Sequence, residues 1–260
     1  MNIVRGVMRP MAAILPLLLA LPCLAAQPED RVAEILRSVD DLWRGRSSEA
    51  LVSMEVVTAH YTRTITMQAW SEGTDKTLVR IVEPKKERGT ATLKAGDSVY
   101  TYLPKTDRTI RLTSGMMMGS WMGSHFTNDD LVKESRLVDD YRGVILFEGV
   151  RDGRETVDFE LIPKPDAPVV WGKIAVTLYR HPVSRQWLPE SQVYYDEDLA
   201  PVRTMVFSDV VELGGRLLPA VMLVRPVDKP DEYTKLVYRK MRFDVPLPAD
   251  LFSLASLRRM

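Results

Sequence analysis

Cysteine is nearly absent from this chain of 260 residues, and the single one, Cys23, lies close to the start. If a signal peptide were removed there, the mature chain would hold no disulfide, no thiol nucleophile and no cysteine metal ligand. Histidine is scarce as well. His60, His125 and His181 are far apart in the sequence and match no zinc-binding spacing, so we expect no metal site.

Sequence signatures of the common enzymes are also missing. The chain contains no G-x-S-x-G nucleophile turn and no Walker-type phosphate loop. The acidic pairs Asp129-Asp130 and Asp139-Asp140 are better explained as helix-start and surface charges than as an acid–base dyad. We therefore expect no catalysis and no cofactor, with an enzyme of unfamiliar kind as an alternative.

Charge of one sign does not dominate. The chain carries 35 basic and 35 acidic residues, whereas a nucleic-acid-binding protein needs a basic face. We expect no nucleic-acid partner.

The N-terminus has the pattern of a secretory signal peptide. Arg5 and Arg9 precede an apolar stretch, residues 11–26, that ends in small residues. Cleavage is expected after Ala25 or Ala26. The stretch is shorter than the ~20 residues that a membrane-spanning helix needs, and two prolines interrupt it.

A lipid-modified Cys23 is an alternative interpretation of the same segment. Pro22 stands before Cys23, where a small, unconstrained residue is usual, and this argues against lipidation. We therefore expect a signal peptide at residues 1–26, a periplasmic location, and one domain over residues 27–260.

One amphipathic helix opens the mature chain. Between Pro28 and Gly45 the apolar residues recur at spacings of three and four, acidic residues fill the first turn, and the glycine suits the end. The apolar stripe consists of Val32, Ile35, Leu36, Val39, Leu42 and Trp43. We expect this stripe to pack on a core.

Almost everything after this helix reads as strand. Short β-rich segments alternate with turn residues, and Asp152-Gly153 and Gly214-Gly215 are two-residue hairpin signals. Val157, Phe159 and Leu161 alternate with acidic residues, which indicates one buried and one wet face. We expect a mainly β protein with few helices, in which ten or eleven strands form a curved antiparallel sheet.

The segment Met116–Leu131 combines four methionines with tryptophan and phenylalanine, beside glycines at positions 115, 119 and 123. One interpretation is that these side chains plug the core. The other is that they cover a binding cavity, because methionine adapts to varied ligands and glycine lets a lid move. A short helix over residues 127–135, capped by Thr127 or Asn128, would follow.

The cavity hypothesis names candidate ligand-binding residues in two groups. The candidates in the loop are Met116, Met117, Met118, Trp121, Met122 and Phe126. The candidates on strands are Trp70, Val79, Ile81, Leu93, Tyr100 and Tyr102. The sequence does not tell which strand face points inward. Asp129 and Asp130 are expected to fix the lid helix rather than touch a ligand.

Three stretches resemble a known family. "MGSWMGSHFTNDDLV" is similar to the M-G-S-x-F-[ST]-x-D-D-L element of the outer membrane lipoprotein-sorting proteins, within the LolA/LolB-like periplasmic carrier superfamily. "YTYLPKTDRTIRL" and "VVELGGRLLPAVMLV" fit the same pattern. The resemblance runs from about Val52 to the C-terminus, and it departs at His125, where the family often has aspartate.

The resemblance implies an incomplete β-barrel, covered by the N-terminal helix and a lid segment, around a hydrophobic cavity. It also implies a monomeric chaperone-like carrier of acylated lipid or lipoprotein cargo, loaded by an inner-membrane permease and unloaded at an outer-membrane acceptor. The alternative is a periplasmic interaction or sensor module that serves an export permease without transporting cargo. An outer-membrane barrel fits poorly, because segments such as "KTLVRIVE" carry charges in mid-run.

Overall fold

The computed structural model describes residues 28–133, 137–167 and 169–259. The expected signal peptide at residues 1–26 lies outside the described residues, and so do the last two residues of the expected lid helix. Over the described part of the chain, no helix combines the length and the apolar character that crossing a membrane requires. That residues 27–260 form one domain stays a prediction.

The expected first helix is present as α1 (Pro28–Arg44). Val32, Ile35, Leu36, Val39 and Leu42 of its apolar stripe are buried, and Trp43 is half-buried. Helix α1 therefore packs as its 3.6-residue periodicity predicts.

Thirteen strands of the described chain form one antiparallel sheet, in the order β6-β5-β4-β3-β2-β1-β13-β12-β11-β10-β9-β8-β7. The sequence predicted ten or eleven, which is too few. The strands are β1 (Ser47–Val57), β2 (Thr62–Glu72), β3 (Lys76–Glu83), β4 (Ala91–Ala95), β5 (Ser98–Leu103), β6 (Arg108–Arg111), β7 (Tyr141–Arg151), β8 (Arg154–Pro163), β9 (Lys173–Arg180), β10 (Trp187–Tyr195), β11 (Pro201–Leu213), β12 (Arg216–Pro226) and β13 (Tyr233–Phe243).

The topology is two meanders joined at one seam. Strands β1 to β6 and strands β7 to β13 each pair with their chain neighbours, and β1 pairs with β13. The expected hairpin turns are present, with positive φ at Asp152, Gly153, Gly214 and Gly215, as two-residue turns of the primed type require. Because β6 and β7 are the two ends of the strand order, the curved sheet does not close into a barrel.

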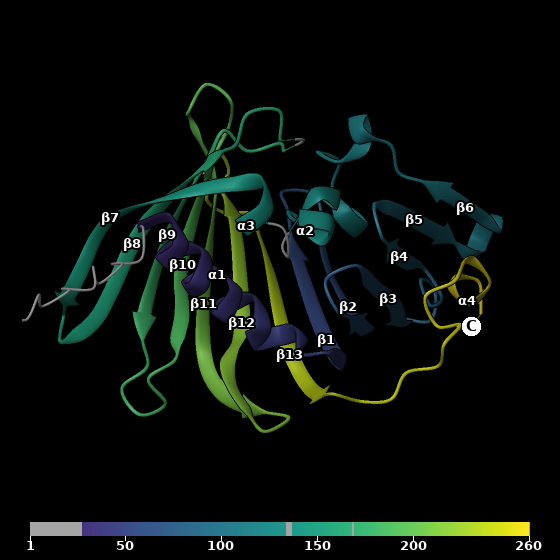
Figure 1. The fold of residues 1–260 in the computed structure, drawn as a ribbon. Coiled ribbons are helices and arrows are strands. Elements are labelled where there is room, and N and C mark those ends of the chain that lie inside the picture. Colours follow the sequence, from purple (N-terminus) through teal and green to yellow (C-terminus); the bar gives the residue numbers. More distant parts are fainter. Residues whose placement is uncertain (1–27, 134–136, 168, 260) are drawn as a thin grey trace, which may run out of the picture.

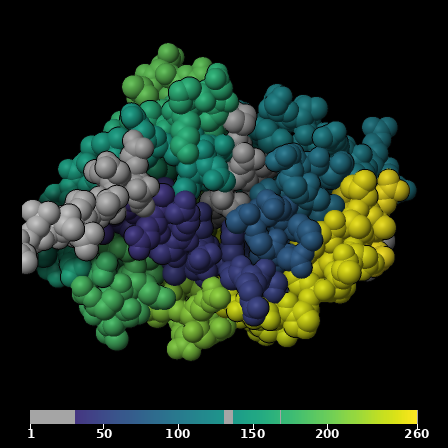
Figure 2. All heavy atoms as spheres, in the orientation of Figure 1, coloured from purple at the N-terminus to yellow at the C-terminus, as the bar shows by residue number. Residues whose placement is uncertain are grey.

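Short helices cover parts of this sheet. They are η1 (Pro104–Thr106), η2 (Ser114–Met116), η3 (Trp121–Gly123), α2 (Asn128–Lys133), α3 (Leu137–Asp140) and α4 (Leu254–Leu257). Helix α1 crosses the inner face of the sheet, in front of β9 to β13, while α4 lies beside the β4–β6 end (Figure 1). Figure 2 shows α1 in the middle of the molecule's face, with the C-terminal segment along one side.

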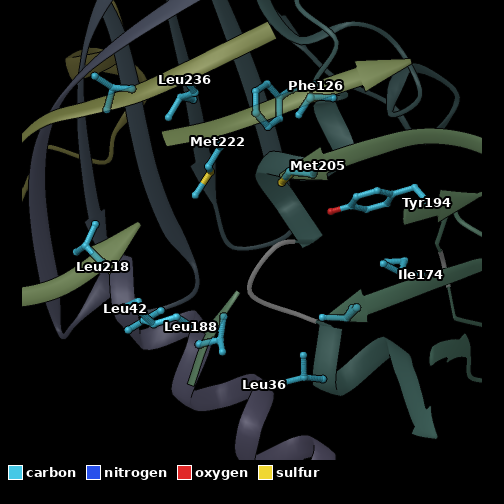
Figure 3. Close-up of a cluster of buried hydrophobic side chains, with 14 of the residues drawn as sticks. Leu36, Leu42, Phe126, Ile174, Leu188, Tyr194, Met205, Leu218, Met222 and Leu236 are labelled. Carbon is cyan, nitrogen blue, oxygen red and sulfur yellow. The ribbon is translucent and has the colours of Figure 1, made fainter. Parts of the chain in front are cut away.

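The main core lies between α1 and the inner face. Leu36 and Leu42 of α1 approach side chains of β10 and β12, with Met205, Met222 and Leu236 of the sheet beyond them (Figure 3). A second, smaller core lies on the outer face of β3 to β5, where the C-terminal segment packs. Its buried residues are Leu78, Ala91, Leu93, Tyr102 and Leu257.

Candidate functional site

A cavity of about 200 Å³ lies between the inner face of the sheet, α1 and residues 114–133, which we call the lid segment. Most of its lining is apolar. The lining residues include Leu36, Val39 and Trp43 of α1, Ala50 and Val52 of β1, Met67 and Ala69 of β2, Val79 of β3, Trp121 and Phe126 of the lid segment, and Met205, Phe207, Met222, Leu236, Tyr238 and Met241 of β11 to β13.

Small side chains on β1 and β2 make this space. Ala50 pairs with Ala69, and Ala69 pairs with Val79, so one row across the three strands presents little bulk. The next row is larger, because it contains Met67 and Ile81. Larger side chains fill the space in that next row to close packing, whereas the short alanine side chains leave it unfilled.

The lid segment is held by a capping box at the start of α2. The Asp130 amide donates to Thr127 Oγ1 at 3.3 Å, and the Thr127 amide donates to Asp130 Oδ2 at 2.7 Å. This reciprocal pair satisfies two amides at the helix start. Thr127 is thus the N-cap, one of the two candidates that the sequence offered.

Asp130 also receives the guanidinium of Arg203 from β11. Arg203 Nη1 and Nη2 lie 2.7 and 2.5 Å from the two carboxylate oxygens, and Nη1 also donates to the His125 carbonyl at 3.1 Å. The Arg203 side chain is only 4% exposed. Burial by itself lowers the pKa of Arg203, but the charge and hydrogen bonds of Asp130 outweigh it and raise that pKa. Arg203 is therefore a charged anchor for the lid segment.

Aromatic rings complete the surroundings of Arg203. Its Cζ atom lies 4.6 Å from the centre of the Trp171 ring and 4.2 Å from that of Tyr194, within the range of a cation–π interaction. Tyr141 donates a hydrogen bond to the Trp171 carbonyl, and burial raises the pKa of this phenol. The aromatic cluster thus packs around the buried guanidinium at one end of the cavity.

Four further contacts fix the lid segment. His125 Nδ1 lies 2.9 Å from Thr234 Oγ1 and its Nε2 lies 3.2 Å from Glu232 Oε2. Tyr61 donates to the Gly123 carbonyl at 2.8 Å. Trp121 donates from Nε1 to Thr92 Oγ1 at 3.1 Å, which places its ring over β4. The lid segment is thus bound to both sides of the seam.

The structure brings only some of the predicted loop residues to the cavity. Trp121 and Phe126 are buried and line it, and their rings meet edge to face at 6.5 Å. Met116 and Met118 are exposed, at 41% and 52%, while Met117 and Met122 are half-buried and are not among the lining residues.

The predicted strand residues divide between the two faces of the sheet. Val79 lines the cavity, and Ile81 is buried in the same core. Leu93, Tyr100 and Tyr102 instead lie on the outer face, in the core with α4. Trp70 is among the lining residues, but its ring packs against this outer core. That any of the twelve predicted residues binds a ligand stays a prediction.

Several cavity residues escaped the sequence analysis. Ala50 and Ala69 gave no signal, because a pair of alanines in two strands predicts nothing. Arg203, which anchors the lid segment through Asp130 and is not itself among the lining residues, did give one. It shares the alternation of Met205 and Phe207, which indicates an arginine that points inward.

Comparison with known proteins gives the family. A family model with the description "Uncharacterized protein" matches residues 73–259, most of the chain. The chain belongs to that family. No curated protein matched the sequence.

Solved structures give the fold. An outer membrane lipoprotein-sorting protein domain from Vibrio parahaemolyticus has 24% identity and a TM-score of 0.74, over 87% of this chain and 98% of that one. A DUF1329 family protein from Desulfovibrio piger has 20% identity and a TM-score of 0.77, over 89% and 100%. A LolA superfamily protein from Nitrosomonas europaea has 20% identity and a TM-score of 0.72, over 89% and 100%.

The chain therefore has a LolA-like fold, and the fold class expected from the sequence is confirmed. The features that carry this fold class are the open curved sheet and the few helices, among them the N-terminal helix α1.

Proposed function

We propose that this LolA-like protein is a carrier that shelters acyl chains of a lipid or lipoprotein in its cavity. The observation that supports this is the apolar cavity itself, enclosed between the sheet, α1 and the lid segment. A carrier needs no catalytic group, and its cavity is lined mainly by side chains that only exclude water.

The energetics favour a cover that moves. Burying one methylene group is worth about 0.8 kcal/mol, so a chain of about 16 carbons represents on the order of 12 kcal/mol as an upper value. The cavity of about 200 Å³ is smaller than the ~300–1,000 Å³ of most ligand sites. A long acyl chain therefore enters only if the cavity widens.

The elements that can move away from the sheet are those held only by side-chain contacts. Strand pairing fixes the sheet, whereas α1 packs on it through an apolar stripe and the lid segment is tied down at Arg203, Thr234 and Tyr61. Closure of this cover competes with the ligand. Such competition lets a carrier bind an acyl chain and still release it to a partner.

The signal peptide pattern and the resemblance to lipoprotein-sorting proteins support a periplasmic location. On this proposal an inner-membrane permease loads the cargo and an outer-membrane acceptor receives it, and the carrier itself acts as a monomer.

The test is to isolate the protein from the native periplasm and identify bound lipid by native mass spectrometry. The variant Ala69→Phe places a ring in the cavity, and we expect it to lose most of the bound lipid. Thr64→Phe is the matched control, because Thr64 lies exposed on the same strand. An empty cavity in the unmodified protein, together with a stoichiometric protein partner, would overturn the carrier and favour the interaction module.

A further inference from the structure

One end of the cavity is polar. Ser48 on β1 pairs with Ser71 on β2, which pairs with Thr77 on β3, and all three line the cavity. We call these residues the hydroxyl row. It lies one step from the small row of Ala50 and Ala69, beside the exposed β2–β3 turn.

The hydroxyl row has hydrogen-bonding capacity to spare. Ser48 Oγ and Ser71 Oγ lie 2.7 Å apart, and both residues are buried, at 5% and 8% exposed. One of the two hydroxyl hydrogens makes this bond, so the other can be donated elsewhere. An acceptor oxygen on a ligand can take this second hydrogen without breaking the bond between the two serines.

Trp43 also lines the cavity and carries a second, buried donor, which a ligand reaches only when α1 gives way as the cavity widens. Its indole Nε1 is buried and has no hydrogen-bond partner within the described residues. The ring lies 6.0 Å from that of Phe207 and 6.5 Å from that of Tyr238, so these neighbours offer it aromatic surface. An indole N–H can only donate, so the group that suits it is an acceptor oxygen.

Charge at this end argues against an anion. Asp40 and Arg44 are one helical turn apart, both line the cavity, and their charges cancel. Arg44 ends α1, and the C-terminal end of a helix carries partial negative charge. The site thus offers donors to oxygen without excess positive charge.

We propose that the hydroxyl row and Trp43 form a headgroup subsite for the neutral ester of an acylated lipid. This rests on the carrier function proposed above. The ester carbonyl accepts hydrogen bonds from Trp43 Nε1 and from a serine hydroxyl. The acyl chain runs over Ala50 and Ala69 towards Trp121 and Phe126.

The test uses two lipids that differ in one carbonyl. 1-Palmitoylglycerol carries an ester, and 1-O-hexadecylglycerol has an ether in its place and a chain of equal length. Native mass spectrometry of the mature protein with both lipids at equal concentration measures their ratio directly. Because each net hydrogen bond is worth at least about a factor of two to three, two of them predict a preference for the ester of about tenfold or more.

Variants assign that preference to the subsite. Trp43→Phe keeps an aromatic ring and removes the donor, and we expect it to lower the ester-to-ether ratio by about threefold or more while both lipids still bind. Trp187→Phe is the control, because the Trp187 ring lies 4.8 Å from Arg180 Cζ and is not part of the lining. Circular dichroism checks that each variant is folded.

The outcomes separate the two proposals. Equal binding of ester and ether, or an unchanged ratio in folded Trp43→Phe, overturns the subsite and leaves the carrier standing. Binding of neither lipid overturns the carrier, and the subsite with it.

Discussion

The substitution Asp130→Asn isolates the charge that anchors the lid segment. It keeps the shape of the side chain but leaves the guanidinium of Arg203, 3% exposed as a residue, without a counter-ion. Breaking one partner of a buried ion pair costs about 3–5 kcal/mol. The aromatic rings of Trp171 and Tyr194 and the carbonyl of His125 still contact Arg203, so we expect the lower end, about 3 kcal/mol.

Denaturant unfolding followed by tryptophan fluorescence measures this loss, and hydrogen exchange over residues 120–130 shows whether the lid segment opens. Asp139→Asn is the matched control, since Asp139 is exposed, and we expect a change within about 0.5 kcal/mol. The double variant Asp130→Asn/Arg203→Met removes both charges of this ion pair, so the two losses should not add. If Asp130→Asn behaved like the control, the ion pair would not anchor the lid.

Two further predictions concern other contacts of the cover. The hydrogen bond from the Ala59 amide and that with His125 lower the pKa of Glu232 below 4.5. The carboxylate therefore stabilises the fold above pH 4.5, and this stabilisation is lost as the pH falls through the lowered pKa. Glu232→Gln should flatten the acid side of a plot of unfolding midpoint against pH, and parallel curves for the two proteins would contradict this. A Cβ atom at Gly143 of β7 would lie 2.2 Å from Val32 Cγ1. Gly143→Ala should therefore push α1 away and lower the free energy of unfolding, measured with denaturant, by about 1–3 kcal/mol. Gly115→Ala is the control, because a Cβ atom there meets open space.

The periodic elements were predictable because their pattern is local. The stripe from Val32 to Leu42 specified α1 and its buried face, and the two-residue turn signals specified two hairpins. The strand count came out low because the apolar run of residues 51–70 reads as continuous. The chain breaks it at Thr58–Tyr61, where the Thr58 amide donates to the Tyr61 carbonyl.

The cavity side of the sheet was harder to predict, and the reason lies at the C-terminus. Because the C-terminal segment covers the outer face of β3 to β5, both faces there carry apolar residues and alternation loses its meaning. Leu93 and Tyr102 therefore looked like cavity residues although they pack against Leu257.

Long-range partners set the other limit. The inward alternation marks Arg203, but its bond to Asp130 joins residues 73 positions apart, and no local pattern reports that. The apolar character of Met116 and Met118 suggested a place inside, yet both residues are exposed.

The seam between β1 and β13 ties the cavity to the order of synthesis. Ser48 lies opposite Phe243, so the first strand can complete its pairing only after the last strand has been made. Closing the chain between β1 and β13 into a loop costs about 4–5 kcal/mol of chain entropy. Each meander can form from short hairpins. The cavity lining, however, needs Ala50 and Val52 from β1 together with Leu236 and Met241 from β13. The cavity is thus complete only after the final strand has left the ribosome and docked, and a nascent chain that stops before residue 233 lacks Leu236 and Met241 of its lining.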